Sequence, residues 1–340
     1  MRPVLRTAAA GALALGICAG AFAAEKIKMA TIAPGSSAYL VMTTMASLVN
    51  QAQKDYELSV DATGAATKHM IEMARGQLDM VMVSPTIYAF MKNGTAMYKK
   101  LAAAPELSKN IALVYWFPYG AYHTIVYADS GIEKLEDIRG KRVFLGPPGG
   151  GAWNAAMQWI KATTGMEPGK DFENVKAGWS AALQGFQDRQ FDVYVTGGIP
   201  PYPQVEQLAL TSKLRIIGLS KSQVDAATPA QLAPTRVQGR QLDRIPAGIY
   251  GDGVVNKEDV YTLGSVVGVG ARLDLSEETV YRITKAFWES LPDAAEKATY
   301  MKRVTKEYAV REGGLPLHPG AARYYREIGL DIPAGSMPRS

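Results

Sequence analysis

Hydrophobic residues along most of this chain recur with a period of two residues in some segments and of about 3.6 residues in others. Lys26–Ile32 alternates apolar and polar positions, as a half-buried strand does, and Tyr39–Gln53 then places apolar residues at helical spacing. Leu58–Ala62 and Thr67–Arg75 repeat this strand and helix, and Met80–Val83 is a third, fully apolar strand. The alternation predicts an α/β protein in which helices cover parallel sheets.

The middle and C-terminal parts of the chain continue the pattern. Predicted strands lie at Ala121–Ala128, Val143–Leu145, Phe191–Val195, Leu214–Leu219 and Gly264–Ala271. Predicted helices lie at Ala152–Thr163, Tyr202–Leu210, Ser276–Ser290, Asp293–Tyr308 and Ala321–Ile328. The polar, proline-containing segment Ser222–Gly239 is predicted to be a linker. A length of 340 residues and an apolar content of 47% predict two packed lobes.

The first residues have the pattern of a secretory signal peptide. Arg2 and Arg6 precede a short apolar run, Ala8–Gly20, and Ala21-Phe22-Ala23 fits a small-x-small cleavage site. A membrane anchor is the alternative, but the run is shorter than the roughly 20 residues that span a bilayer. We therefore expect residues 1–24 to be removed and the mature protein to be periplasmic.

The composition excludes several kinds of site and partner. The leader contains Cys18, the only cysteine, so the mature chain is expected to have no disulfide and no thiolate metal site. The formal charge is +5 without a basic run, a pattern that does not indicate nucleic-acid binding. His69, His123 and His318 are the only histidines and share no metal-ligand spacing. We expect no metal and no other cofactor.

Sequence signals for catalysis are weak. The chain has no Gly-x-Ser-x-Gly elbow, and a mature chain without cysteine has no Cys–His nucleophile. Gly146–Gly151 superficially resembles a phosphate cradle, but it lacks the Gly-Lys-Ser/Thr ending of a P-loop and the spacing of a dinucleotide fingerprint. The patterns favour a binding protein over an enzyme.

Several predicted strands end in turns of Gly, Ser, Thr or Pro. In an open parallel sheet, the carboxyl ends of the strands face the binding crevice. Helix N-termini at this edge present unpaired N–H groups with a positive partial charge, which favours small anions such as carboxylates. The alternative is that these residues merely form the turns between strand and helix.

Motifs in this order resemble those of the TAXI family of TRAP-transporter solute-binding proteins, over about Lys26 to Leu330. They are Asp129-Ser130-Gly131-Ile132 with Leu135–Val143, Gly146–Gly151, Asp192–Gly198 with Pro200, Ile245-Pro246-Ala247-Gly248 with Tyr250, and Leu317–Tyr325. The resemblance implies two doubly wound α/β lobes, joined by two hinge strands, with a ligand cleft between them. It places lobe one at 25–122 plus 222–340 and lobe two at 123–221. The C-terminal helices are then expected to pack on lobe one.

The same resemblance places the ligand at the loops that the strand ends also indicate. The candidate ligand-binding residues are Gly35, Ser36, Ser37, Tyr39, Thr63, Gly64, Ser84, Gly149, Gly150, Gly151, Trp153, Asn154, Thr196, Gly197 and Gly198, with His123 on a hinge strand. Trp179 is a weaker candidate for ligand contact. At positions where the family often has Ser, Thr and Glu, this chain has Gly150, Ala152 and Trp153. This departure weakens the expectation of a glutamate-like dicarboxylate ligand.

Two classes of function remain open at this stage. The first is a periplasmic binding protein that closes over a small organic acid or amino acid and delivers it to a TRAP-type membrane permease. A variant delivers the ligand to a sensor kinase instead. The second is a periplasmic enzyme that acts on a small polar metabolite in the same cleft.

Overall fold

The computed structural model describes residues 24–34 and 36–339 of the chain. The predicted signal peptide, apart from Ala24, and the candidate residue Gly35 lie outside the described residues. No helix in the described ranges is long and apolar enough to cross a bilayer.

One twisted sheet of ten strands runs through the described molecule. Its strands are β1 (Glu25–Ala30), β2 (Tyr56–Asp61), β3 (Met80–Val83), β4 (Ile111–Tyr127), β5 (Arg142–Phe144), β6 (Glu173–Asn174), β7 (Val193–Gly198), β8 (Leu214–Ile217), β9 (Arg240–Ile245) and β10 (Val260–Arg272). The order is β2-β1-β3-β10-β4-β7-β5-β6, while β8 pairs with β4 and β9 with β10. Pairing is parallel towards both ends of the sheet and antiparallel around β4 and β10.

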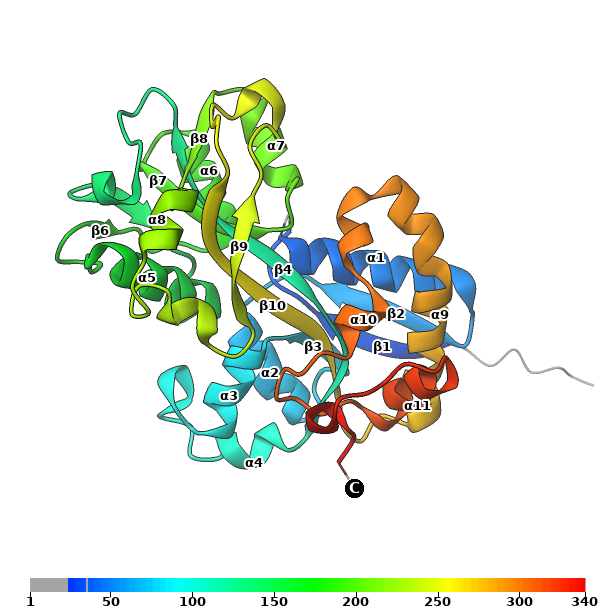
Figure 1. Cartoon of the computed structure of the whole chain (residues 1–340). Coiled ribbons are helices and arrows are strands. Elements are labelled where there is room, and N and C mark those ends of the chain that lie inside the picture. Colours follow the sequence, from blue (N-terminus) through cyan, green and yellow to red (C-terminus); the bar gives the residue numbers. More distant parts are fainter. Residues whose placement is uncertain (1–23, 35, 340) are drawn as a thin grey trace, which may run out of the picture.

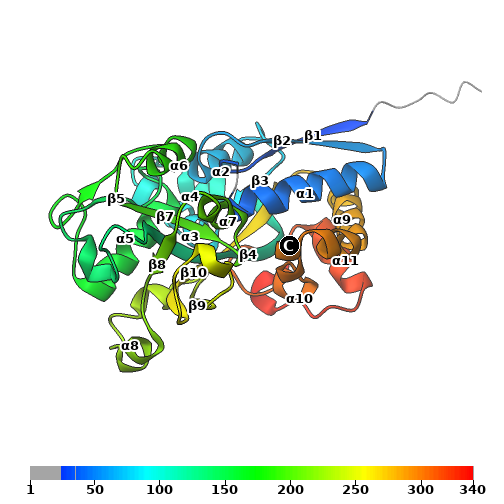
Figure 2. The ribbon, with the colours of Figure 1, turned by 90° about the horizontal axis from the view of Figure 1, so that it is seen from above.

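Helices cover both halves of this sheet. They are α1 (Ser37–Ala52), α2 (Ala66–Ala74), α3 (Pro85–Lys92), α4 (Ala104–Ser108), α5 (Gly151–Thr164), α6 (Trp179–Gln187), α7 (Pro203–Ala209), α8 (Lys221–Ala226), α9 (Glu277–Lys297), α10 (Lys306–Ala309) and α11 (Pro319–Glu327). Figures 1 and 2 show α5, α6 and α8 on one side of the molecule and α1, α9 and α11 on the other. This arrangement confirms the predicted two-lobed α/β fold.

The two longest strands, β4 and β10, run antiparallel from one lobe into the other (Figure 1). Every residue of β4 is buried, which explains why its sequence is almost continuously apolar. Gly120 in the middle of β4 has a φ of +101°, and a Cβ there would lie 2.1 Å from the carbonyl oxygen of Gly198. Glycine is therefore required where β4 and β7 approach each other most closely.

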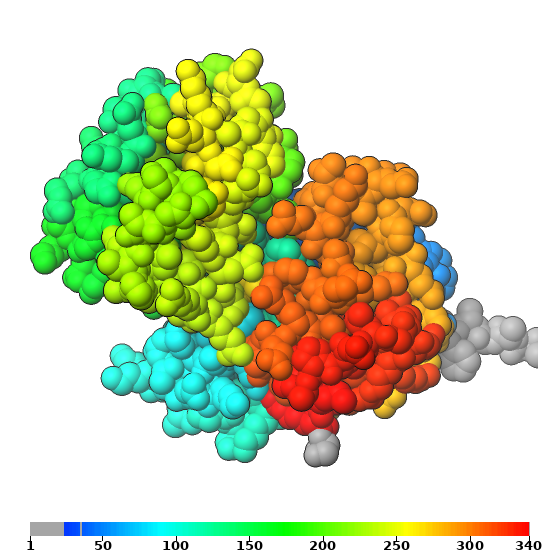
Figure 3. Space-filling view, in the orientation of Figure 1, coloured from blue at the N-terminus to red at the C-terminus, as the bar shows by residue number. Residues whose placement is uncertain are grey.

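The smaller hydrophobic core contains residues from both sides of the predicted lobe boundary at residue 222. Ile245, Val254 and Val260 pack in this core with Phe186 and Leu214 of the second lobe. The chain therefore returns to the first lobe along β10, and the residues from Ile245 to the start of β10 pack with the second lobe. In the space-filling view, the yellow surface of this segment adjoins the green second lobe (Figure 3).

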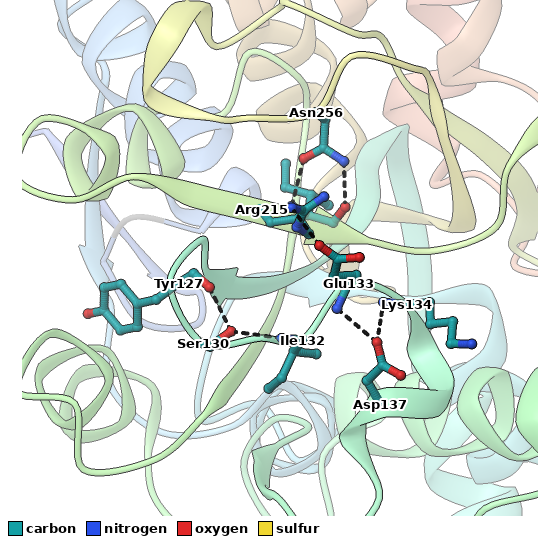
Figure 4. A network of polar contacts seen from close by, with 9 residues as sticks. Tyr127, Ser130, Ile132, Glu133, Lys134, Asp137, Arg215 and Asn256 are labelled. Atoms are coloured by element: carbon teal, nitrogen blue, oxygen red, sulfur yellow. Dashed lines mark hydrogen bonds and ion pairs between the residues drawn. The ribbon is translucent and has the colours of Figure 1, made fainter.

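Polar contacts fix the same segment to the second lobe (Figure 4). The Asn256 side chain accepts a hydrogen bond from the Ile216 N–H and donates one to the Ile216 carbonyl, at 2.9 and 2.8 Å. Arg215 pairs with Glu133 at 3.4 Å, beside the turn in which Ser130 donates to the Tyr127 carbonyl. The motif that begins at Asp129 therefore holds a turn together, away from the cavity described below.

Other predicted elements differ in extent. The predicted break between helices near Asp293 is absent, because α9 continues through Pro292 to Lys297. The predicted linker 222–239 contains most of α8 and a 3-10 helix at Ala233–Arg236. Strand β4 begins ten residues before the predicted start at Ala121.

Candidate functional site

A cavity of about 80 Å³ lies between the lobes, beside the crossing strands. The first lobe contributes the ends of β1 and β3, the loop after β2, and the starts of α2 and α3. The second lobe contributes the starts of α5 and α6. The lining residues are Ile32, Gly64, Ala65, Ala66, Thr67, Met82, Ser84, Thr86, Ile87, Tyr119, Tyr122, Pro147, Gly150, Gly151, Ala152, Ala155, Trp179, Arg240, Ser265 and Val267.

Four helices begin at the wall of this cavity, and none of them has a side-chain cap. The N-cap residues of α2, α3, α5 and α6 are Ala65, Ser84, Gly150 and Gly178, and none of them makes a side-chain hydrogen bond to its own helix. None of these helices has an acidic residue in its first turn. The first N–H groups of a helix have no partner within the helix, so these ends keep their hydrogen-bonding capacity for a ligand.

Arg240, at the start of β9, is the charged residue of the cavity wall. Its side chain is 8% exposed, and its guanidinium donates to the side-chain oxygens of Gln158 at 2.7 Å and Asn154 at 3.2 Å. Both acceptors are neutral amides on α5, and no carboxylate in residues 24–34 or 36–339 pairs with Arg240. Burial lowers the pKa of Arg240, although arginine remains protonated at physiological pH. The wall therefore contains a buried positive charge that no acidic side chain of the described residues neutralises.

Apolar and aromatic side chains form most of the remaining wall. Ile32 lies just after β1, Met82 in β3 and Ile87 in α3, and Val267 comes from β10. Tyr119 and Tyr122 come from β4, and Trp179 from α6. The Tyr119 hydroxyl is buried and has no hydrogen-bond partner among the described residues. Burial raises the pKa of Tyr119, so this hydroxyl stays protonated and can donate a hydrogen bond.

A second cavity, of about 190 Å³, lies on the other side of Trp179. Its described lining mixes polar and apolar residues and carries no charge: Ala33, Pro34, Ser36, Trp179, Ser180, Leu183, Gln184, Gln187, Tyr194, Thr196, Tyr202 and Gln204. The hydroxyls of Tyr194 and Tyr202 both donate to the Gln204 side-chain oxygen, each at 3.3 Å. This cavity has no group that would neutralise a ligand charge.

The structure distributes the sequence-predicted site residues over both cavities. Gly64, Ser84, Gly150 and Gly151 line the first cavity. Ser36 and Thr196 line the second. Asn154 lines neither, but it holds the guanidinium of Arg240 from α5.

Three predicted residues lie at contacts between chain segments and line neither cavity. The Ser37 hydroxyl accepts a hydrogen bond from the Ile199 N–H at 3.0 Å, which joins α1 of the first lobe to the end of β7. A Cβ on Gly197 would lie 2.0 Å from the Tyr119 ring, and one on Gly198 would lie 2.2 Å from the Tyr202 ring. Both glycines therefore make room for aromatic rings.

The remaining predicted residues also lie outside these two cavities. Thr63 hydrogen-bonds to Asp61, and the Trp153 indole donates to the Asn174 side chain at 3.2 Å. Tyr39 lies in the first turn of α1, and Gly149 in the loop before α5.

His123 is fully buried on β4 and lines neither cavity. Its Nε2 lies 2.6 Å from the Tyr250 hydroxyl, and its Nδ1 lies 2.9 Å from the Ala121 carbonyl oxygen. These contacts fit a neutral ring that donates from Nδ1 and accepts at Nε2. Burial lowers the pKa of His123 to about 4, so it is neutral at pH 7.

No sequence motif marks Arg240, Tyr119 or Tyr122 as site residues. The two tyrosines belong to the part of the chain from which β4 forms, and their positions depend on how β4 crosses the molecule. Arg240 reaches the cavity because β9 pairs with β10, with Arg240 opposite Ser265. No local pattern around Arg240 signals this pairing. The described residues contain no group of three His, Cys, Asp or Glu side chains placed to hold a metal ion.

Comparisons with known proteins find solved structures that resemble most of this chain. A solved structure described as a periplasmic transporter is 17% identical, with a TM-score of 0.54 over 91% of this chain and 94% of its own. The alkanesulfonate-binding protein SsuA from Xanthomonas axonopodis, bound to MOPS, is 16% identical, with a TM-score of 0.49 over 94% of this chain and 89% of its own. A TRAP periplasmic solute-binding protein from Chromohalobacter salexigens, with bound D-glucuronate, is 12% identical, with a TM-score of 0.44 over 90% of this chain and 93% of its own.

At these identities, the likeness to solved structures concerns the fold, and the periplasmic transporter structure carries that comparison. The family match is independent of it and covers most of the sequence. The model of the NMT1-like family matches residues 29–329. The chain therefore belongs to the NMT1-like family and has the two-lobed fold of periplasmic binding proteins.

Proposed function

We propose that this protein is a periplasmic solute-binding component of a TRAP-type transporter, which captures a small organic anion between its lobes and delivers it to a membrane permease. Family membership and fold support solute binding. The resemblance of its motifs to the TAXI family supports the TRAP-type permease as partner. One observation carries the anion: Arg240 is buried at the cavity wall, and no acidic side chain in the described chain neutralises it.

Burial of a cation without a neutralising partner is unfavourable. Binding of an anion beside Arg240 is therefore favourable. An isolated buried charge costs several kcal/mol even after relaxation (order of magnitude). Charge-assisted hydrogen bonds from Arg240 to a carboxylate recover part of this energy. The uncapped ends of α2, α3, α5 and α6 add N–H donors and positive partial charges around the same space.

The site draws its groups from both lobes, so ligand binding favours the closed arrangement. Ser84 and the start of α3 belong to the first lobe, whereas Gly150 and Gly151 begin α5 of the second. A ligand that touches both walls stabilises the conformation in which they are close. A permease that recognises this closed surface then receives loaded protein in preference to empty protein.

A melting-temperature screen of the mature protein against organic acids, amino acids and neutral analogues tests the proposal. A ligand that binds only the folded state raises stability by RT ln(1 + [L]/Kd). We expect a shift of several degrees with at least one organic anion, and recovery of that compound unchanged. Mass spectrometry of the denatured protein reveals any ligand retained through purification. A shift confined to uncharged compounds, or chemical conversion of the bound compound, would contradict the proposal.

A further inference from the structure

We propose that the ligand is an organic monoanion with an apolar body, without an ammonium group or a second acidic group. The inference rests on the proposed function and narrows its ligand class. It follows from the sign, number and position of the charges around the first cavity, and from the chemistry of the remaining wall.

The cavity wall offers one full charge. Arg240 is the only charged side chain among the lining residues, and its other contacts are the neutral amides of Asn154 and Gln158. One guanidinium can neutralise one carboxylate or sulfonate. A second acidic group on the same ligand would be buried against apolar side chains with no cation to pair with it, which is unfavourable.

Binding of an ammonium group in this cavity is unfavourable. Recognition of an amino acid requires an acceptor for its ammonium, usually a carboxylate, and no Asp or Glu lines the wall. Four helices begin at the wall of this space, and their N-terminal ends carry positive partial charge. A cation placed here would therefore be repelled by both Arg240 and the helix ends.

The rest of the wall is mostly apolar and suits a hydrocarbon part of the ligand. Met82, Ile87, Val267 and the rings of Tyr122 and Trp179 surround the space with carbon atoms. Six lining residues carry a hydroxyl group, but carbon atoms form most of the wall, and the Thr86 hydroxyl is already bonded to the Gln238 carbonyl at 2.9 Å. A heavily hydroxylated ligand would lose hydrogen bonds with water that this wall cannot replace.

Isothermal titration calorimetry with ligands of one carbon number tests each feature separately. The probes are hexanoate, hexanesulfonate, gluconate, 2-aminohexanoate, adipate and hexanamide, with 3-phenylpropanoate as an aromatic monoanion. We expect hexanoate, hexanesulfonate or 3-phenylpropanoate to bind most tightly. Gluconate, 2-aminohexanoate, adipate and hexanamide should each bind at least about 100-fold more weakly than the best monoanion, because each leaves a buried polar or charged group unpaired.

The variants Arg240→Gln and Arg240→Lys separate the ligand class from the site. If Arg240→Gln abolishes binding and Arg240→Lys retains part of it, Arg240 holds the anion. Tight binding of 2-aminohexanoate, adipate or gluconate that is lost in Arg240→Gln would overturn the monoanion class and leave the proposed function standing. Equal binding of hexanamide, or unchanged affinity in Arg240→Gln, would overturn both. Failure of every apolar monoanion to bind would also overturn the inference.

Discussion

The longer helices of this protein fall into two groups, which differ in how their N-termini are satisfied. In α1, α9 and α11, a side chain of Ser36, Ser276 or His318 accepts a hydrogen bond from the first turn. In α2, α3, α5 and α6, no side chain does so, and all four of these ends line the cavity between the lobes. The difference indicates that these four cavity helices keep their N–H groups for a ligand, whereas α1, α9 and α11 use theirs for stability.

The serines at the two kinds of helix end make the contrast concrete. Ser276 occupies the N-cap of α9 and accepts from the Thr279 N–H at 3.0 Å, and Glu277 and Glu278 follow in the first turn. Ser84 occupies the same position in α3, yet its hydroxyl makes no capping bond, and no acid follows. The same residue type therefore has two environments, and the cavity is what distinguishes them.

The largest expected effect comes from Arg240→Gln. Loss of the buried charge should weaken anion binding by at least about 100-fold, because charge-assisted hydrogen bonds disappear. The melting temperature of the unliganded protein should not fall, since an uncompensated buried charge is removed. Arg323→Gln, which removes an arginine paired with Glu278 on the exposed surface, is the matched control and should keep the wild-type affinity. Equal losses of anion affinity in the two variants, measured by calorimetry, would show that Arg240 has no special role in binding.

A charge placed at the start of α5 should have the next largest effect. Gly150 has a φ of −79°, so a side chain is tolerated, although its Cβ would lie 3.0 Å from the Pro147 carbonyl oxygen. Gly150→Asp should supply an N-cap and compete with the ligand anion for the same N–H groups. We expect an affinity more than about tenfold below that of Gly150→Asn, which adds a cap of the same shape without charge. Equal affinities of the Asp and Asn variants would place the anion away from α5.

Removal of the two serine hydroxyls should have smaller effects, one on stability and the other on ligand affinity. Ser276→Ala should lower the free energy of unfolding by about 1 kcal/mol and leave affinity unchanged. Ser84→Ala should leave the free energy of unfolding nearly unchanged and weaken ligand binding by several-fold, as expected for loss of about one hydrogen bond. Urea unfolding and calorimetry measure the two quantities. A stability loss in Ser84→Ala equal to that in Ser276→Ala would show that Ser84 is an ordinary cap.

The smallest expected effect is a change in acid stability at α11. His318 accepts from the Gly320 N–H at Nδ1 and lies 3.0 Å from the Leu275 carbonyl at Nε2, an arrangement that requires a neutral ring. Burial lowers the pKa of His318, with Glu277 and Asp274 partly opposing the shift. The unfolded chain, in which the pKa is about 6.5, therefore binds a proton more readily. This contribution to stability is present above that pH and is lost as the pH falls.

Comparison of the wild type with His318→Asn measures that contribution. Asparagine also caps helices but does not titrate, so the free energy of unfolding of the variant should decline less steeply below about pH 6.5. His123, whose pKa burial lowers to about 4, contributes to both proteins and cancels in the difference. Parallel pH profiles of the two proteins would exclude His318 as a titrating cap.

Much of the fold could be predicted from the chain because its elements have local signals. The fully apolar run Met80–Val83 is confirmed as β3, and the helix predicted at Thr67–Arg75 lies within one residue of α2. Strand β9 and the first half of β4 were missed. Their pairing partners lie far away in sequence, and Pro118 and Gly120 interrupt the local pattern of β4.

The residues of the site also fall into those that local sequence signals predict and those that only the tertiary structure reveals. Gly64, Ser84, Gly150 and Gly151 follow strands, and a general rule about strand ends directed attention to them. Arg240 lies 86 residues from Asn154, which orients it. Its place at the cavity is a consequence of tertiary structure, and so is the burial of its charge. A sequence pattern identifies turns that can bind, but it does not reveal which charged side chain the fold brings to them.

A crystal structure of the protein with its tightest-binding monoanion tests the central claim most directly. We predict that the acidic group lies within hydrogen-bonding distance of the Arg240 guanidinium and of N–H groups at the start of α5, with the ligand body against Tyr122 and Trp179. An acidic group bound instead in the second cavity, beside Gln204, with Arg240 still in contact only with Asn154 and Gln158, would contradict the account.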